Sequence, residues 1–400
     1  MSAPESDPRL PSVCRDDPEC RVLAALRDTP AIFADLAAAS GSELAIQSRL
    51  RQTYPDDLVR AALTLTELRR KAAGKFTRAD GMWFDRQGLE QSTAEPVARH
   101  KARRFTGQVF DLCCGIGGDA LALADDCDVT AVDINPAACW RTLENARVYG
   151  VAARLLTECA DVTTVDLADS LVHIDPDRRP FSAGRVSRIE DYVPGLPWLQ
   201  ELIGRTRGGA IKVGPASNFG GKFAGTEVEL ISLHGECKEA TVWYGELAGT
   251  APFRATVLPV GESIAGHPLD AVAEQSELRN YLYDPDPAVV RAGLVDVLAE
   301  QLGLCRLDSA EEYLTGDQLV QSPFVQAFAV IQSLPHNDRA LRAALRGSDI
   351  GQLEIKCRHV AVDAEALRRR LPLPGTQPGV LLIARVQGKT RSILATRLRE

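Results

Sequence analysis

The sequence predicts an α/β fold: a mostly parallel sheet with helices on both faces, preceded by a helical region and followed by a smaller α/β domain. Between residues 107 and 247, short apolar runs typical of strands alternate with amphipathic runs typical of helices. Upstream of this stretch, apolar residues recur at helical spacing, and downstream a second set of strands and helices begins. We therefore expect three parts: residues 1–92, 93–250 and 251–400.

The N-terminal part is expected to be helical. Apolar residues recur at i, i+3 and i+4 in four of its segments, residues 21–28, 31–39, 43–50 and 56–73. A junction follows at residues 75–91, in which Phe76, Met82, Trp83 and Phe84 look exposed. With its basic neighbours, this junction is either a surface for nucleic acid or an aromatic cap that packs the helices against the sheet. We favour packing.

The central part alternates between patterns typical of strands and patterns typical of helices, and it ends with two strands that have no helix between them. The expected strands are residues 108–113, 128–133, 153–157, 170–175 and 209–213. The expected helices are residues 117–126, 136–150 and 195–205. Two more strands, 226–233 and 239–247, are separated by five residues only, so they are expected to form an antiparallel hairpin.

The C-terminal part also contains patterns typical of strands and of helices, but they do not alternate regularly. We expect strands at residues 253–260, 324–332, 354–360, 379–386 and 392–398. We expect helices at residues 286–303, 337–347 and 363–371, of which the first is long and unbroken. Strands and helices in this mixture predict a second, smaller α/β or α+β domain.

Charge is distributed unevenly along the chain. The net charge of −8 argues against nucleic acid as a partner. However, residues 339–400 hold 13 Lys or Arg against 5 Asp or Glu, and smaller basic clusters lie at residues 69–78 and 99–104. Such clusters either face phosphates or form the solvated face of a helix, and for any one cluster the second interpretation is favoured.

Neither metal binding nor membrane insertion is indicated. The ten cysteines form no C-x-x-C pair and the six histidines form no H-E-x-x-H motif, so we expect reduced thiols and no metal site. No apolar run approaches the ~18 residues that a membrane span needs. The first twenty residues are acidic and interrupted by prolines, unlike a signal peptide. We therefore expect a cytoplasmic protein.

A strand, a glycine-rich turn and a helix follow one another at residues 109–120. The glycines allow a tight turn and let a ligand approach the N–H groups where the helix begins. The pattern G-x-G-x-x-A also fits a dinucleotide-binding loop. The glycines alone therefore leave a nicotinamide cofactor and another adenosine cofactor open.

Four aspartates favour the second cofactor class. Asp111, Asp133, Asp161 and Asp175 follow or end four successive expected strands, so they lie at the edge of the sheet where ligands bind in open α/β folds. An amino acid joined to adenosine offers an ammonium, two ribose hydroxyls and an adenine amino group to such acceptors. A dinucleotide needs more groups that face phosphate and fewer carboxylates.

Three of these motifs together resemble a known family. D-L-C-C-G-I-G-G-D at 111–119, A-V-D-I-N at 131–135 and I-D-P-D-R-R at 174–179 are similar to motifs of class I S-adenosylmethionine-dependent methyltransferases. The resemblance covers residues 107–247 and implies a Rossmann-like, seven-stranded methyltransferase sheet whose last strand is reversed. Residues 145–151 are similar to RNA guanine-N2 methyltransferases of the cap-hypermethylase type.

A narrower resemblance covers most of residues 70–400. Several segments are similar to bacterial methyltransferase-like proteins with a C-terminal THUMP-like domain, namely residues 88–105, 173–179, 211–219, 235–247 and 281–294. The class I resemblance implies S-adenosylmethionine as the cofactor. It implies that Asp111, Cys113, Gly115 and Gly117 contact the methionine part. It implies that Asp133 and Ile134 contact the ribose and the face of the adenine, and that Asp161 and Val162 contact the adenine.

The resemblance also indicates where catalysis takes place. In amine-methylating relatives a polar residue, a pair such as Pro-Pro and then an aromatic residue hold the target amine. Here Asp175 and Pro176 keep the polar residue and the first proline, whereas Asp177 and two arginines replace the rest, so no aromatic residue occupies the stacking place. Arg178 either stacks on a base or binds a phosphate, or it pairs with an acid such as Glu190; both interpretations stay open.

Two basic features bear on the substrate. Lys212, at the end of an expected strand, either binds a substrate phosphate or carboxylate or, as we favour, pairs with an acid. THUMP domains of RNA-modifying enzymes bind RNA, so the basic C-terminal part implies RNA as the partner. The leading hypothesis is methyl transfer to RNA, at a base nitrogen. The alternatives are methylation of a small molecule or protein, and a binding module without catalysis.

Overall fold

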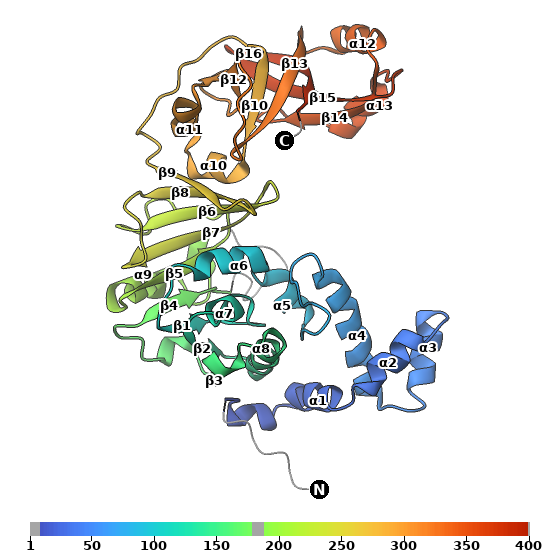
Figure 1. Cartoon of the computed structure of the whole chain (residues 1–400), viewed down its shortest axis with the longest axis vertical. Coiled ribbons are helices and arrows are strands. Elements are labelled where there is room, and N and C mark those ends of the chain that lie inside the picture. Colours follow the sequence, from blue (N-terminus) through green and yellow to red (C-terminus); the bar gives the residue numbers. More distant parts are fainter. Residues whose placement is uncertain (1–8, 178–187, 399–400) are drawn as a thin grey trace. The chain divides into compact units, whose positions relative to one another are not determined.

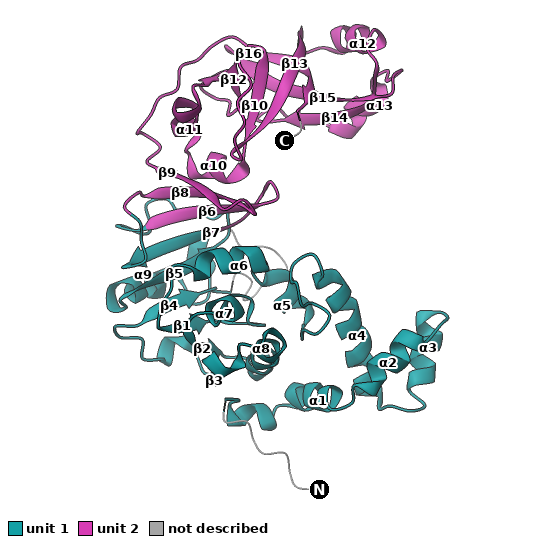
Figure 2. Cartoon of the chain, in the orientation of Figure 1, with its two compact units in different colours: residues 1–226, 241–249 teal, residues 227–240, 250–400 magenta. Residues whose placement is uncertain are grey.

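The computed structural model describes residues 9–177 and 188–398, so Arg178 lies outside the described residues. The chain divides into two compact units (Figures 1 and 2). Unit 1 comprises residues 1–226 and 241–249, and unit 2 comprises residues 227–240 and 250–400. The expected boundaries at residues 92 and 250 stay predictions.

Unit 1 begins with helices, as the periodicity predicts. They are α1 (Pro18–Arg27), α2 (Ala31–Ala38), α3 (Glu43–Leu50), α4 (Asp56–Ala72), α5 (Arg86–Gln91) and α6 (Glu95–Ala102). The longest, α4, has Asp56 and Asp57 in its first turn and three basic residues in its last. Both charges favour the helix, because the acids face its positive end and the bases its negative end.

The junction after α4 is buried. Phe76, Met82, Trp83 and Phe84 are each at most 6% exposed and belong to the hydrophobic core of unit 1. Trp83 meets Trp140 edge to face, with ring centroids 4.9 Å apart. The expected exposure of these four residues is therefore wrong, because other apolar side chains of this core cover them, whereas the favoured interpretation as packing is confirmed.

A parallel sheet carries the rest of unit 1. Its strands are β1 (Gln108–Leu112), β2 (Asp128–Asp133), β3 (Leu155–Cys159), β4 (Leu171–Ile174) and β5 (Gly208–Val213), in the order β3-β2-β1-β4-β5. The helices between them are α7 (Gly118–Leu123), α8 (Pro136–Tyr149) and α9 (Leu196–Arg205), and the 3₁₀ turns are η1 (Ser12–Arg15), η2 (Ala152–Arg154), η3 (Val162–Thr164) and η4 (Ile189–Asp191). The strand order reverses between β1 and β4, which opens a crevice at their carboxyl ends.

Strand β7 (Glu236–Gly245) follows β5 in the sheet, and its last residues belong to unit 1. Its first residues belong to unit 2. The strand order continues there as β7-β6-β8-β9, where β6 is Glu227–Leu233, β8 is Phe253–Leu258 and β9 is Glu262–Gly266. Two residues, His234 and Gly235, join β6 to β7 with φ of 53° and 76°. Two positive φ values are typical of a two-residue hairpin turn, so the expected hairpin is present with a shorter connection.

The rest of unit 2 contains a seven-stranded sheet in the order β11-β12-β10-β13-β16-β15-β14. Its strands are β10 (Tyr281–Pro285), β11 (Cys305–Arg306), β12 (Leu314–Gly316), β13 (Val325–Pro335), β14 (Ile350–Cys357), β15 (Gln377–Val386) and β16 (Lys389–Arg397). Helices α12 (Asp338–Arg346) and α13 (Ala364–Arg370) share one leucine-rich core with β14 and β15. The expected mixture of strands and helices is confirmed.

The expected long helix at residues 286–303 is wrong. The chain forms two helices there, α10 (Pro287–Ala292) and α11 (Val295–Leu302). Gly293 ends α10 in the left-handed conformation, with φ of 72°, and its N–H bonds to carbonyls of that helix. Glycine adopts this conformation at little cost, so it caps the first helix where periodicity alone suggests continuation. Across the described ranges, no helix combines the length and apolarity of a membrane span.

Candidate active site

A cavity of about 450 Å³ opens in unit 1, with lining residues at the carboxyl ends of β1, β2 and β4. Its described lining contains no lysine or arginine but seven aspartates: Asp85, Asp111, Asp119, Asp133, Asp161, Asp175 and Asp177. The cavity therefore suits a cationic ligand with several hydrogen-bond donors.

The loop between β1 and α7 forms one wall of this cavity. Cys113 and Gly115 line it, with φ of 57° and 58°. Gly117 caps α7 with φ of 86°, and a Cβ there would lie 3.0 Å from Thr142 Cγ2. The Thr142 hydroxyl donates to the Gly115 carbonyl at 3.0 Å. Gly117 thus supports the loop from behind, and it is the one expected cofactor residue outside the described lining.

Asp133, at the end of β2, holds the same loop. Its two carboxylate oxygens accept hydrogen bonds from the N–H groups of Gly115 and Asn135, each at 2.9 Å. Burial raises the pKa of Asp133, and these two hydrogen bonds oppose the rise. Each oxygen has a second lone pair, so the carboxylate can also accept hydrogen bonds from ligand hydroxyls.

Ile134, Asp161 and Val162 lie on the lining beyond Asp133. Ile134 is 71% exposed, which is unusual for a large apolar side chain beside a cavity, and it offers an apolar surface to a flat ring. Asp161 accepts hydrogen bonds from the N–H and hydroxyl of Thr163 at 2.9 and 2.7 Å, which lower its pKa.

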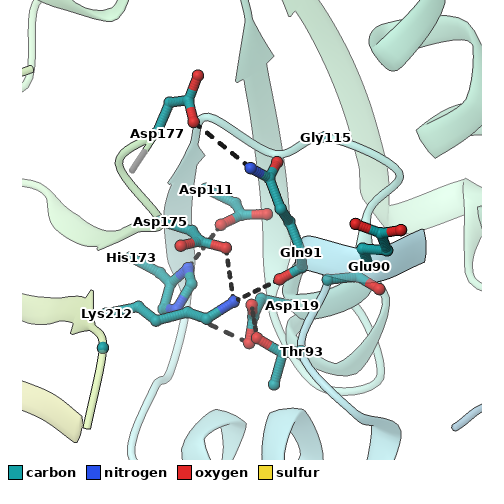
Figure 3. Close-up of polar contacts among 12 residues, drawn as sticks. Glu90, Gln91, Thr93, Asp111, Gly115, Asp119, His173, Asp175, Asp177 and Lys212 are labelled. Carbon is teal, nitrogen blue, oxygen red and sulfur yellow. Dashed lines mark hydrogen bonds and ion pairs between the residues drawn. The ribbon is translucent and has the colours of Figure 1, made fainter. Parts of the chain in front are cut away.

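Asp111 is almost fully buried, although it lines the cavity. Its Oδ1 lies 2.7 Å from Nδ1 of His173 on β4 (Figure 3). Its Oδ2 has no hydrogen-bond partner among the described residues. Burial raises the pKa of Asp111, and the bond to His173 opposes the rise. A buried acceptor without a partner is costly, so Oδ2 is an acceptor available to a ligand.

Three further buried residues extend the Asp111–His173 contact into a chain of polar contacts. Lys101 on α6 lies 3.2 Å from His173 Nε2 and 2.8 Å from Asp119 Oδ1. The Thr93 hydroxyl donates to Asp119 Oδ2 at 2.6 Å (Figure 3). Burial alone would raise the pKa of Asp119, but nearby positive charge, above all that of Lys101, lowers it. Asp119 is thus a carboxylate that neutralises Lys101.

Asp175, directly after β4, pairs with Lys212 of β5. The two atoms Lys212 Nζ and Asp175 Oδ2 are 2.6 Å apart, and Nζ also donates to the Gln91 carbonyl at 3.1 Å (Figure 3). Lys212 is 3% exposed. The favoured interpretation of Lys212, pairing with an acid, is confirmed. Substrate contact through Lys212 is excluded in this arrangement, because its ammonium is covered.

Pro176 and Asp177 line the cavity next to Asp175. Asp177 and Val193 exchange two backbone hydrogen bonds, at 2.9 and 3.0 Å, which brings Val193 and Pro194 into the same lining. Glu190, a suggested partner of Arg178, contacts Lys222; the prediction for Arg178 itself lies outside the described residues.

Sequence reasoning missed part of this site. His173 stands inside an apolar strand, and a polar residue in a strand that is buried along its whole length is a signal for a buried polar contact. Lys101 gave no such signal because it lies in an amphipathic helix, and Asp119 gave none because an acid in the first turn of a helix is common. The segment 85–93 also lines the cavity, although it was assigned largely to the helical region.

Two expected basic clusters are corrected in part. Lys101 is 1% exposed and paired with Asp119, so it does not face phosphates. Arg69, Lys75 and Arg78 donate to backbone carbonyls of other segments at 2.9, 2.6 and 2.7 Å. These side chains tie unit 1 together rather than forming a free basic surface.

One group of metal-ligand types lies in unit 2. Glu311, Glu312 and His359 bring possible ligand atoms within 4.8 Å of one another. Glu311 accepts hydrogen bonds from the N–H groups of Glu312 and Arg385, and His359 lies 2.6 Å from Glu312. Protein partners therefore occupy this group and we assign no metal to it; the expected lack of a metal site stays a prediction.

Similarity to known proteins identifies the family. Two curated proteins of Mycobacterium tuberculosis, from strains CDC 1551 and H37Rv, are each described as an uncharacterized S-adenosylmethionine-dependent methyltransferase. Each is 39% identical to this chain over 336 residues, which cover 80% of this chain and 91% of the relative. The chain is an S-adenosylmethionine-dependent methyltransferase. S-adenosylmethionine is accordingly its cofactor.

Three family models match parts of this methyltransferase. Residues 106–191 match RNA cap guanine-N2 methyltransferase, residues 325–397 match THUMP domain-like, and residues 16–72 match a domain of unknown function. A crystal structure described as a methyltransferase from Porphyromonas gingivalis W83 has a TM-score of 0.75 and 20% identity, over 95% of this chain and 98% of that one. At this identity the match shows a shared fold. The expected methyltransferase fold with a THUMP-like C-terminal domain is confirmed, except that the sheet has nine strands rather than seven, because β8 and β9 follow β6 in the strand order.

The residues of the cavity fit this cofactor. Asp111 Oδ2 is a buried acceptor without a protein partner, as an ammonium group requires. Asp133 retains lone pairs for the ribose hydroxyls, and Ile134 exposes an apolar surface to the adenine ring. We infer that Asp111, Asp133 and Ile134 would hold methionine, ribose and adenine, with Asp161 and Val162 at the adenine end. When bound, S-adenosylmethionine supplies a methyl group on an electron-poor sulfonium.

Proposed function

We propose that this methyltransferase acts on RNA and transfers its methyl group to a nucleobase nitrogen. The observation that carries the proposal is the match of residues 106–191 to RNA cap guanine-N2 methyltransferases, because this segment contains both the glycine loop and the Asp175-Pro176 pair. The match of residues 325–397 to THUMP-like domains supports RNA as the partner. That region is also the basic part of the chain, with 13 basic and 5 acidic residues at 339–400.

Asp175 is our candidate for orienting the target amine. Lys212 donates to Oδ2, which leaves Oδ1 to accept a hydrogen bond from the amine. The carbonyl of Pro176 is a second acceptor beside it. Two acceptors can align the amine so that its lone pair points at the methyl carbon, and an in-line displacement needs mainly this alignment. The proton that the amine loses on methylation passes to solvent water.

The base would rest on an aliphatic surface. The amine-methylating relatives use a pair such as Pro-Pro and then an aromatic side chain, but Asp177, Arg178 and Arg179 follow Pro176 here. The bridge from Asp177 to Val193 supplies Val193 and Pro194 to the lining instead. Contact with two aliphatic side chains is weaker and less directional than stacking on a ring, so we expect looser selection of the base.

The charge of the cavity restricts how RNA enters. Seven aspartates line it, of which Asp119 and Asp175 are paired with lysines. The other five repel phosphate groups, so we expect the backbone to stay outside. A base that is unstacked and turned away from its backbone carries no phosphate into the cavity. We therefore expect single-stranded or loop nucleotides to be methylated in preference to paired ones.

Transfer of labelled methyl groups tests the proposal. The full chain is incubated with radiolabelled S-adenosylmethionine and the total RNA, protein or small-molecule fraction of a deletion strain. We expect label in RNA that nuclease releases, and at least a tenfold loss in Asp175→Ala with S-adenosylhomocysteine affinity retained. The Asn280→Ala variant, which changes a side chain of unit 2 with one 3.4 Å contact, is the matched control.

Label in another fraction would refute the proposal in favour of a small-molecule or protein substrate, which the overall charge of −8 favours. Label in no fraction, with cofactor binding intact, would refute it in favour of a binding module. The replacement of the usual residues by Asp177, Arg178 and Arg179 is the observation that favours this last alternative.

A further inference from the structure

A chain of buried polar side chains lies behind the cofactor end of the cavity. It runs from Thr93 through Asp119, Lys101 and His173 to Asp111. All five are at most 7% exposed, and they come from five places in the sequence. Burying two carboxylates, an ammonium and an imidazole costs stability unless each is paired. Within this group of five side chains, Asp111 Oδ2 and Asp119 Oδ1 are the buried atoms that have no hydrogen-bond partner among the described residues, and Asp119 Oδ1 is ion-paired at 2.8 Å.

The partners of His173 define its hydrogen-bonding state. An ammonium group can only donate, so Lys101 Nζ at 3.2 Å requires His173 Nε2 to accept. The hydrogen of a neutral imidazole then lies on Nδ1 and is donated to Asp111 Oδ1 at 2.7 Å. A doubly protonated ring would place two positive charges side by side. Lys101 thus selects the tautomer in which His173 is a donor toward Asp111.

The charges of this cluster do not balance without a ligand. The two carboxylates of Asp111 and Asp119 face one ammonium, that of Lys101, and a neutral His173. Another buried cation, Lys212, pairs with Asp175. The cluster therefore has one uncompensated negative charge, and it belongs to the residue with the free acceptor, Asp111. One ammonium group placed at Oδ2 supplies both the missing charge and the missing hydrogen bond.

We propose that Lys101, Asp119 and His173 are positioning residues which hold Asp111 as a fixed acceptor for one ammonium group, so that the site selects adenosine ligands by the amine of their amino-acid part. Asp111 touches the ligand, whereas His173 acts through Asp111. Selection arises because a ligand without the amine leaves a buried carboxylate oxygen unpaired, and sites built to bond a polar group reject analogues that lack it. This inference rests on the cofactor and not on the RNA substrate.

Calorimetric titration of the full chain tests the inference without any measurement of activity. The two probes are S-adenosylhomocysteine and its deaminated analogue, S-adenosyl-4-mercaptobutyrate, which keeps the adenosine and the carboxylate. We expect the unmodified protein to bind the first at least ~10-fold more tightly, as a hydrogen bond between charged groups implies. Equal affinity for the two probes would overturn the inference before any variant is made.

Two variants of His173 then separate positioning from packing. In His173→Asn the side-chain amide can replace the Nδ1 donor, whereas in His173→Gln the amide reaches the place of Nε2 and leaves Asp111 without it. Both variants keep a polar group in the core. We expect His173→Gln to lose at least ~10-fold in S-adenosylhomocysteine affinity and less than ~2-fold for the deaminated analogue, with His173→Asn close to the unmodified protein.

A structural role for His173 would give another pattern. If both variants weaken both probes by the same factor, the cluster only stabilises the fold and the inference is overturned. The same holds if His173→Gln binds S-adenosylhomocysteine as tightly as the unmodified protein. If the variants do not fold, the affinities of the two probes for the unmodified protein decide whether the inference stands.

Discussion

Asn145 on α8 links the aromatic junction to the glycine loop, and its removal gives a large expected effect. This fully buried side chain accepts a hydrogen bond from the Trp83 N–H at 2.7 Å and donates to the Trp83 and Ile116 carbonyls at 3.1 and 2.9 Å. The substitution Asn145→Ala leaves three buried backbone groups unpaired. Each costs about 1–3 kcal/mol. We therefore expect the free energy of unfolding of unit 1 to fall by about 3–9 kcal/mol.

Urea unfolding followed by tryptophan fluorescence measures this loss, because Trp83 and Trp140 lie in the core that the change disturbs. The midpoint should shift strongly for Asn145→Ala and by less than the error for Asn280→Ala, whose side chain is exposed. Ile116 belongs to the cavity lining, so affinity for S-adenosylhomocysteine should fall as well. A loss below ~1 kcal/mol would refute the reasoning, since it would mean that water or a rearranged backbone satisfies all three groups.

Three further predictions concern the cofactor. Gly117→Ala should weaken S-adenosylhomocysteine binding at least ~10-fold in calorimetry, because a Cβ at φ of 86° is strained and would meet Thr142 at 3.0 Å; unchanged affinity would contradict this role. Ile134→Ser should weaken adenosine itself by ~3- to 10-fold while leaving the melting temperature unchanged, because a side chain that is 71% exposed contributes little to the fold; a large drop in melting temperature would contradict this. Affinity for S-adenosylhomocysteine should also fall as the pH is lowered. Burial raises the pKa values of Asp111 and Asp133, so these carboxylates take up protons at a higher pH than ordinary aspartates do. A protonated Asp111 no longer pairs with an ammonium group. Titrations in a pH series check this, and an affinity that is constant down to the usual aspartate range would exclude it.

The parts of the fold that depend on local pattern were predictable from the sequence. The alternation of strands and helices, the glycine turn and the aspartates after successive strands follow from periodicity and from the rule that parallel strands end at one edge. Of the eight expected cofactor residues, all but Gly117 line one cavity, together with Asp175 and Pro176. Their roles stay predictions until a ligand is bound.

The parts that depend on contacts between distant residues were not predictable. Lys101 and His173 are 72 residues apart, and nothing in either neighbourhood indicates the other. Phe76 and Trp83 look exposed beside basic residues, yet their burial is decided by α8, which comes later in the chain. Gly293 stands within an apolar periodicity that fits one helix or two, and only its backbone conformation distinguishes them.

The acidic lining of the cavity also bears on how one reaction gives way to the next. Donation of the methyl group converts a sulfonium into a neutral thioether, so the spent carrier leaves with one positive charge fewer than the donor brought. Among seven aspartates without an opposing lysine or arginine in the described lining, this difference favours the fresh donor over the used one. The negative charges that attract the donor therefore bind the product less strongly, which favours replacement of the product by a new donor molecule.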